Sequence, residues 1–286
     1  ANTTTRPVTV LRQRNAGPAV ARNAGAARAS GDILVFTDAD CEPAPEFLAE
    51  IQRPFEAEAV SGVQGAYRTR QKGVVPRFAQ VEFEDRYAYT RRFPCLDLVA
   101  TYAAAFRRTV FSGEGGFDTS FPVANNEDTE FSYRLCARGH KLVFAPAAVV
   151  YHRHPDSFGK YLRIKFWRAY WRLAACRKHP GKVLRDGYTP GVVRLQTALA
   201  GVFLLGIVLS PLTAVGGLLA WLTGACLIGT SLPFAAFAWR RDRMVGLVAP
   251  GLVFSRSVAF AAGAAWAVAA RVLPRAGFGR DCGDRP

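Results

Sequence analysis

The first half of the chain alternates short apolar runs with amphipathic stretches, the pattern of an α/β domain. Residues 33–36 form a continuous apolar run, which is typical of a strand buried on both faces of a parallel sheet. An Ala-rich helix is expected at 19–29, ended by Gly31, and a short strand at 8–11. This strand–helix–strand order predicts a doubly wound, Rossmann-like α/β fold with a mostly parallel sheet.

The same alternation continues to residue 156, which we take as the end of the first domain (residues 1–156). The pattern predicts further strands at 60–67, 100–106, 142–144 and 149–154, and helices at 45–55, 75–92 and 128–138.

A basic amphipathic segment, residues 157–191, follows this domain. Between residues 158 and 177 apolar and basic side chains interleave at helical spacing, which predicts a helix lying in the plane of a membrane interface. An ordinary surface helix with snorkelling arginines is the alternative. The apolar members are Tyr161, Leu162, Phe166, Trp167, Tyr170, Trp171 and Leu173, and the basic members are Arg163, Lys165, Arg168, Arg172 and Arg177.

Residues 192–286 contain three apolar stretches, at about 195–211, 212–238 and 245–270, and a short basic tail. The last two exceed the roughly 20 residues that cross a bilayer, and the first is marginal. A cluster of arginines at 240–243 places the loop between the second and third stretches, and with it the first domain, on the cytoplasmic side of an inner or plasma membrane. Arg256 within the third stretch and the basic tail leave open whether that stretch crosses or is re-entrant.

The net charge of +15 is concentrated in the later segments. Residues 1–156 carry 19 Lys and Arg against 18 Asp and Glu, residues 157–191 carry 9 against 1, and residues 192–286 carry 9 against 3. A nucleic-acid-binding domain would show basic charge over its folded surface, so we expect no nucleic-acid partner. The basic middle segment instead fits an anionic membrane face.

The six cysteines are scattered without a C-x-x-C pair, so neither a disulfide framework nor a zinc site is expected. They are Cys41, Cys95, Cys136, Cys176, Cys226 and Cys282. The only methionine is Met244, and we therefore expect the natural chain to begin before Ala1.

Two carboxylates, Asp38 and Asp40, emerge directly after the apolar run at 33–36. Ligands of open α/β sheets bind beyond the carboxyl ends of the strands, and alternation puts both side chains on one side of an extended chain. Paired oxygen donors suit Mg²⁺ or Mn²⁺ shared with phosphate oxygens. Helix capping is the competing interpretation of this short motif.

Two further groups contain candidate chemistry. Asn125, Asn126, Glu127 and Asp128 open the helix expected at 128–138, where they are either capping residues or, in the case of Asp128, a general base. The strand at 149–154 ends in His152, Arg153 and His154. Their imidazoles either complete a metal shell or bond backbone carbonyls.

Taken in order, these motifs resemble the family-2 glycosyltransferases over residues 8–155. The resemblance rests on residues 15–25 (NAGPAVARNAG), 29–31 (ASG), 36–40 (FTDAD) and 115–118 (GGFD), followed by Glu127, Asp128, Arg134, Leu135 and Gly139. It implies an A-type glycosyltransferase fold and an inverting, metal-dependent transfer of a sugar from a nucleotide-sugar donor. Aspartate activation of the acceptor and metal stabilisation of the departing diphosphate give this chemistry a coherent physical basis.

The resemblance also implies roles for individual residues. Asp128 would be the catalytic base, and Asp38, Asp40 and His152 would hold Mg²⁺ or Mn²⁺. The donor side would comprise Gly17, Arg22, Asn23, Asp38 and Asp40. The acceptor side would comprise Gly115, Gly116, Phe117, Glu127, Arg134, Arg168 and Arg172, with the two arginines of the basic helix near the acceptor's phosphate.

The chain departs from the family pattern in two places. The family's first strand and its acidic pair, which hold the nucleoside base, should lie upstream of Val8, so the domain lacks its first βα unit. The Q-x-x-R-W motif of processive synthases is missing where residues 166–172 read FWRAYWR. We therefore expect single-sugar transfer to a membrane-associated acceptor, such as a lipid-linked glycan in cell-envelope or exopolysaccharide synthesis.

Three alternatives stay open. A processive polysaccharide synthase would use the apolar stretches as a channel. A catalytically inactive membrane scaffold would not need Asp38, Asp40 and Asp128. A nucleotidyltransferase shares the sheet and the metal chemistry but typically has a Gly-rich, Lys-containing loop near its start.

Overall fold

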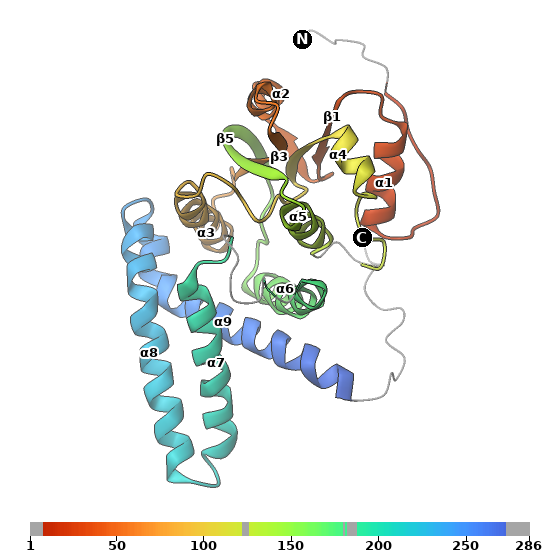
Figure 1. Ribbon diagram of the computed structural model, residues 1–286. Coiled ribbons are helices and arrows are strands. Elements are labelled where there is room, and N and C mark those ends of the chain that lie inside the picture. The colour runs from red at the N-terminus through yellow and green to blue at the C-terminus, as the bar shows by residue number, and fades with distance from the viewer. Residues whose placement is uncertain (1–7, 122–125, 180, 182–187, 273–286) are drawn as a thin grey trace.

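The computed structural model describes residues 8–121, 126–179, 181 and 188–272. Within them, an α/β domain stands on a group of long helices (Figure 1). Asn125, Cys282 and the basic tail from residue 273 onward lie outside the described residues, as does part of the basic segment (180 and 182–187). Cys41, Cys95, Cys136, Cys176 and Cys226 are free thiols.

The α/β domain contains five strands and six α-helices within the described residues. They run in the order α1 (Pro18–Arg28), β1 (Ile33–Thr37), β2 (Cys41–Pro43), α2 (Phe47–Gln52), a 3₁₀ helix η1 (Arg53–Glu56), β3 (Val60–Arg68), α3 (Val74–Thr90), β4 (Ala103–Arg107), α4 (Arg108–Gly113), α5 (Glu127–Ala137), β5 (Lys141–His152) and α6 (Phe158–Lys178). The expected helices at 19–29, 75–92 and 128–138 are confirmed to within two residues at each end.

The strands form one sheet in the order β1-β4-β3-β5-β2. Only β3 and β5 pair in parallel, and the other three pairs are antiparallel. The expectation of a mostly parallel sheet is therefore wrong over the described strands, although the α/β class is right. A continuous apolar run shows that a strand is covered on both faces, but it carries no information about the direction of the neighbouring strands.

Three strand predictions need further correction. Residues 8–11 form no strand, and Val8 and Val10 are exposed. The strand at 33–36 is only half-buried, because within the described residues β1 pairs with β4 alone. The two strands expected at 142–144 and 149–154 are one long strand, β5, which ends at His152 and pairs with β3 through two register shifts.

Helices cover both faces of the sheet. The alternating side chains of β4 divide between two apolar clusters, with Ala103 and Ala105 on one face and Ala104 and Phe106 on the other. The first cluster includes Phe47, Ile51 and Phe55 from α2 and η1, and the second includes residues of α1, α4 and α5. The sheet is therefore the middle layer, and the ends of its strands are left to form the site.

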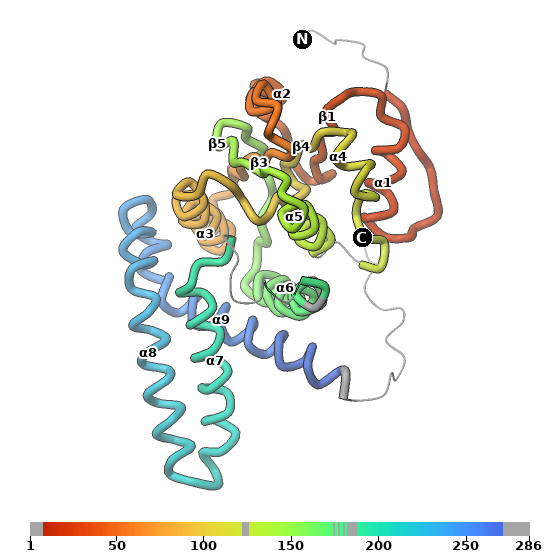
Figure 2. Tube along the Cα trace, viewed as in Figure 1, coloured from red at the N-terminus to blue at the C-terminus, as the bar shows by residue number. Residues whose placement is uncertain are grey.

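The three apolar stretches are helices α7 (Gly191–Leu209), α8 (Ala214–Trp239) and α9 (Arg243–Val272). Each is long and apolar enough to cross a membrane. The helices α7 and α8 form a hairpin that extends away from the α/β domain, whereas α9 runs obliquely beneath α6 (Figure 2). The basic amphipathic helix α6 is thus covered on one side by α5 and on another by α9.

Candidate active site

An arginine of the first helix joins two of the acidic motifs. The guanidinium of Arg22 in α1 donates to Asp38 Oδ1 at 2.7 Å and to Glu127 Oε1 at 2.5 Å. Asp38 follows β1 and Glu127 opens α5, so the fold brings distant motifs to one point. The Arg22 side chain is only 17% exposed, and its ion pairs are stronger for being shielded from water.

The short strand β2 brings Asp40 to His152. Cys41 of β2 lies opposite His152 of β5, and Nε2 of His152 is 3.2 Å from Asp40 Oδ2. Asp40 is 60% exposed, so the pair is open to a ligand. Of the three predicted metal ligands, two are therefore adjacent, while Asp38 is paired with Arg22.

Hydrogen-bond partners fix which ring nitrogen of His152 carries the hydrogen. Gln80 donates through Nε2 to the carbonyl of Tyr67 at 3.1 Å, which leaves its Oε1 to accept from Nε2 of His154 at 3.1 Å. Burial lowers the pKa of His154 to about 3, so this ring is neutral and carries a single hydrogen, at Nε2. Its Nδ1 must then accept from Nδ1 of His152, 3.2 Å away.

This chain of hydrogen bonds places a hydrogen on Nδ1 of His152 and directs its Nε2 toward the carboxylate of Asp40. At that distance the nitrogen and the carboxylate oxygen can share one cation, either a proton or a metal ion. Nitrogen and carboxylate ligands both suit a divalent ion that also takes phosphate oxygens. Within the described part of the chain no three His, Cys, Asp or Glu side chains gather as a larger metal shell. The pair therefore fits a metal that is completed by its ligand.

Asp128 occupies the start of α5, beside the Arg22 ion pairs. Its Oδ1 accepts from the amide of Thr129 at 2.7 Å, and its Oδ2 lies 3.4 Å from the amide of Thr101. Partial burial raises the pKa of Asp128, which makes the carboxylate a stronger base. Asn126 makes no side-chain capping bond, whereas Asp128 accepts from an amide of the first helical turn, so capping accounts for one of its two oxygens.

Glu127 is buried, and its carboxylate oxygen Oε2 has no hydrogen-bond partner among the described residues. Burial and the neighbouring charge of Asp128 raise the pKa of Glu127 to about 7. An unsatisfied buried acceptor is costly, so this atom marks a point where a ligand hydroxyl would be stabilised.

The glycine-rich loop at 115–117 is held in shape by Asn23 and Arg134. The amide of Asn23 accepts from the backbone N–H of Phe117 at 2.9 Å and donates to its carbonyl at 2.8 Å. Arg134 donates to the carbonyls of Glu114 and of Gly116. Both Gly115 and Gly116 have positive φ, at 76° and 69°.

These contacts change the expected roles of several residues. One N–H and the oxygen of the Asn23 side-chain amide bond the backbone of Phe117, so Asn23 positions the loop, and its predicted contact with the donor stays a prediction. Phe117 is 2% exposed and packs among Phe36, Phe111 and Phe131, so it belongs to the core and not to an acceptor surface. Gly17 precedes α1 with φ 90°, and its backbone N–H donates a hydrogen bond to Oδ1 of Asn15.

The arginines of α6 lie against the start of α5. The carbonyl of Arg168 accepts from Asn126 at 3.3 Å, and the positive charge of Arg168 is close enough to oppose the rise in the pKa of Asp128. Arg172 donates to Thr129 at 3.4 Å and lies over the ring of Tyr133. The basic helix thus adjoins the predicted base, as expected for residues on the acceptor side.

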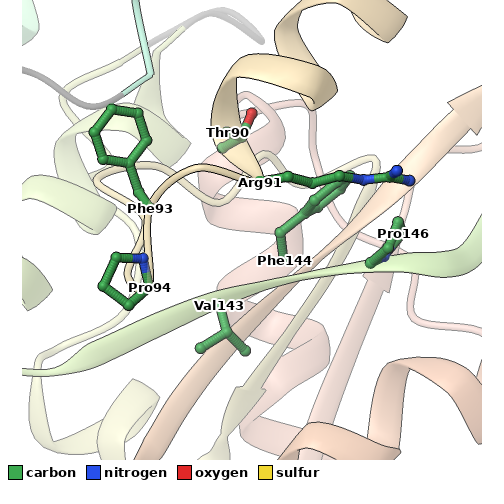
Figure 3. Close-up of a pocket in the computed structure, with 7 residues that line it drawn as sticks. All are labelled: Thr90, Arg91, Phe93, Pro94, Val143, Phe144 and Pro146. Carbon is green, nitrogen blue, oxygen red and sulfur yellow. The ribbon is translucent and has the colours of Figure 1, made fainter.

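A cavity of about 480 Å³ lies elsewhere, between the end of α3 and β5 (Figure 3). Its lining residues are Thr90, Arg91, Phe93, Pro94, Val143, Phe144 and Pro146. None of them belongs to the groups described above, and we assign this cavity no role in the site.

Sequence reasoning missed Gln80 and Tyr67. Tyr67 stacks on His152 with 4.5 Å between ring centroids, and it lies near the end of β3, parallel to β5. Because the carboxyl ends of parallel strands share one edge of the sheet, the place of Tyr67 near the end of β3 could have indicated that it lies beside His152. Gln80 sits inside α3 among apolar neighbours, and nothing in its sequence context distinguishes it.

The curated proteins that this chain matches are glycosyltransferases. A pre-mycofactocin glycosyltransferase of Mycobacterium tuberculosis is 26% identical over 172 residues, covering 58% of this chain and 36% of that protein. A probable glycosyltransferase of Bacillus subtilis, YdaM, is 26% identical over 166 residues, covering 54% and 36%. The chain thus spans little more than a third of the length of these curated relatives.

The fold is similar to that of a solved mannosyltransferase, PcManGT from Pyrobaculum calidifontis, in complex with GDP-Man and Mn²⁺. The TM-score is 0.53 at 22% identity, covering 88% of this chain and 66% of that one. The family model described as glycosyltransferase-like family 2 matches residues 1–170, more than half of the chain. On this match, together with the motifs and the site that they build, the chain belongs to the glycosyltransferase-like family 2.

Proposed function

We propose that the protein is an inverting, metal-dependent glycosyltransferase that moves a sugar from a nucleotide-sugar donor to an acceptor hydroxyl. The observation that carries this proposal is the single cluster in which Arg22 links Asp38 to Glu127, beside the Asp40–His152 pair and Asp128. A diphosphate site and a carboxylate base are thereby neighbours, which is what a one-step displacement requires.

The roles follow from the geometry of each group. Asp128 takes the proton of the acceptor hydroxyl, the acceptor oxygen forms a bond to the anomeric carbon, and the bond from that carbon to the diphosphate breaks with its electron pair leaving on the diphosphate. Arg22 holds Asp38 and Glu127 in place beside the leaving group. Attack opposite to the leaving group inverts the anomeric configuration.

Asp40 and His152 would hold the divalent metal, Mg²⁺ or Mn²⁺. Bound there, the ion stabilises the negative charge that develops on the departing diphosphate. The complex of PcManGT with GDP-Man and Mn²⁺ supports this proposal by analogy.

The acceptor is proposed to be membrane-associated, as a lipid-linked glycan of cell-envelope or exopolysaccharide synthesis would be. Two features support it: the arginines of α6 adjoin Asp128, and three apolar helices follow. Arg168 and Arg172 would attract the phosphate of such an acceptor. The catalytic domain is proposed to face the cytoplasm, on the side of Arg240, Arg241 and Arg243.

The proposed activity is tested by nucleoside diphosphate release from a panel of nucleotide-sugars, using the full-length protein in membranes with lipid extract as acceptor. We expect release with one donor that requires Mn²⁺ or Mg²⁺ and stops with EDTA. Asp40→Ala should lower it by at least about 100-fold, the effect of losing a few kcal/mol of charge stabilisation.

Glu42→Ala is the matched control for Asp40→Ala. Glu42 is a nearby, exposed carboxylate paired with Arg70, and its loss should leave release unchanged. Equal activity of Asp40→Ala and wild type, or release that is insensitive to EDTA, would contradict the metal assignment. The absence of release with every donor would contradict the transferase itself.

The hydrogen-bond chain behind His152 gives a separate prediction. Gln80→Leu removes the group that fixes the hydrogen of His154 at Nε2, so His152 loses its set tautomer. We expect Mn²⁺ affinity, measured by titration of the Mn²⁺ spin-resonance signal in the presence of the nucleoside diphosphate, to weaken about 10–100-fold. Gln52→Leu, at an exposed position of α2, should bind Mn²⁺ as the wild type does, and an unchanged affinity in Gln80→Leu would refute the chain.

A further inference from the structure

Helix α9 is apolar and long enough to span a bilayer, yet it meets the catalytic domain at its very beginning. The carboxylate of Asp242, one residue before α9, accepts from Arg77 of α3 at 2.5 Å. Arg241 pairs with Glu84 of the same helix at 3.2 Å. The start of α9 is therefore fixed against α3.

The middle of α9 is held to the same helix. Arg256 donates to Glu82 of α3 at 2.6 Å and to Gln196 of α7 at 2.7 Å. The other oxygen of Glu82 accepts from Lys165 and Tyr161 of α6, at 2.9 and 2.8 Å. Arg256 thus has a partner within the protein, and that partner belongs to the catalytic domain.

A third contact lies further along α9. Gly263 packs so closely on α6 that an added Cβ would overlap the carbonyl oxygen of Phe166. The helix α6 is in turn fastened to α5, where Asn126 donates to the carbonyl of Arg168. At Gly263 the helix α9 is therefore still at the lower surface of the catalytic domain.

The length of α9 between these contacts determines whether the helix can cross a bilayer while it makes them. From Asp242 to Gly263 a helix rises about 32 Å, close to the roughly 30 Å of a bilayer's hydrocarbon core. A perpendicular α9 would carry Gly263 to the opposite face of the membrane and Arg256 to its middle. The contacts with Phe166 and Glu82 would then draw α6 and the polar helix α3 into the hydrocarbon, which is too costly.

The remaining face of α9 is apolar. Met244, Leu247, Trp266 and Val268 are 51%, 68%, 42% and 58% exposed, and Arg256 is the only charged residue in the sequence between Met244 and Ala270. In an ordinary interfacial helix the polar face meets water, but here the catalytic domain covers the side that carries Arg256. The exposed face is suited to acyl chains.

We propose that α9 does not cross the membrane but lies in the bilayer interface on the side of the catalytic domain, between that domain and the acyl chains. The α7–α8 hairpin, whose tip at Leu212 is 77% exposed and far from the domain, is the membrane-crossing unit among the described residues (Figure 1). The chain then leaves α9 on the side where the positive-inside rule favours the arginines that follow in the sequence.

The test is a depth profile of spin labels in vesicles of phosphatidylcholine and phosphatidylglycerol. Single cysteines in a full-length chain with its own cysteines replaced would carry the label, with the melting temperature checked for each. Depth follows from collisions with oxygen and with a water-soluble nickel complex. Labels on α9 would stand at the exposed positions Leu247, Gly251, Ala265 and Ala269 and at the half-buried Val258, and labels on α8 at Val215, Leu222, Ala225, Leu232 and Ala236.

On α8 we expect the depth of the label below the surface of the hydrocarbon core to rise to about 15 Å near Ala225 and to fall toward both ends of the helix. On α9 every label should lie about 5–10 Å deep, and an impermeant thiol reagent should reach Leu247→Cys and Ala269→Cys from the same side of the membrane. A maximum of about 15 Å near Val258, with the two end positions reached from opposite sides, would overturn the proposal. Labels shielded from both collision partners would also overturn it, because a second protein surface would then cover α9.

Discussion

Asp128→Asn is expected to lower kcat by about 10²–10⁴-fold and to leave the affinity for metal and donor nearly unchanged. The asparagine keeps the size of the side chain and its bond from the amide of Thr129, but it cannot take a proton. The proposed metal ligands, Asp40 and His152, lie on other elements and should be unaffected. Steady-state release of nucleoside diphosphate and an independent Mn²⁺ titration measure the two effects separately.

Asp32→Asn is the control for Asp128→Asn, because Asp32 is 98% exposed and touches none of the site residues. It should leave kcat unchanged. Since burial raises the pKa of Asp128 and the base acts as carboxylate, wild-type kcat should increase as the pH rises through that pKa. A kcat in Asp128→Asn within a factor of a few of the wild type would remove Asp128 from the role of base.

Glu82→Gln is expected to destabilise the protein by about 3–5 kcal/mol, because it leaves two buried cations without a counter-charge. The Glu82 side chain is 5% exposed and lies between Lys165 and Arg256. In thermal unfolding in detergent this corresponds to a Tm lower by at least about 6 °C. Glu84→Gln, at the 39% exposed partner of Arg241, should cost less than about 1 kcal/mol.

Two further measurements separate charge from shape in this cluster. Replacing Glu82, Lys165 and Arg256 together by leucine should recover much of the stability lost in Glu82→Gln.

Burial alone would raise the pKa of Glu82, but the charges of Lys165 and Arg256 outweigh it and lower the pKa from 4.5 to about 2. The stabilisation is therefore present above pH 4.5 and is lost as the pH falls toward 2, a loss that Glu82→Gln should not show. Equal stability of Glu82→Gln and the wild type would contradict this account.

Much of the fold could be predicted from sequence because its signals are local. The 3.6-residue periodicity located α3, α5 and α6, and the apolar runs located β1 and β3. The strand β2 was not predicted, because Cys41–Pro43 is short, contains a proline and forms only where β5 is there to pair with it. The antiparallel direction of β4 was also not predictable, since it depends on which strands stand on either side.

The site shows the same division between features that a local motif predicts and features that depend on distant parts of the fold. Asp38, Asp40, Glu127 and Asp128 were predicted from motifs. The structure brings Asp38, Glu127 and Asp128 to Arg22, and Asp40 to His152. Their partners were harder to assign. A sequence motif does not distinguish a residue that touches a ligand from one that shapes the loop beside it, as Asn23 does.

The apolar cluster under α3 has a practical consequence for producing this protein in parts. Phe78 and Val81 of the catalytic domain share one core with Ala238, Val245 and Val253 of the last two helices. A fragment that ends with the first domain would expose this apolar surface to water. The carboxylate of Glu82 would also lose its ion pair with Arg256. Such a fragment is expected to aggregate during purification, whereas one that keeps the chain through α9 should stay dispersed in detergent.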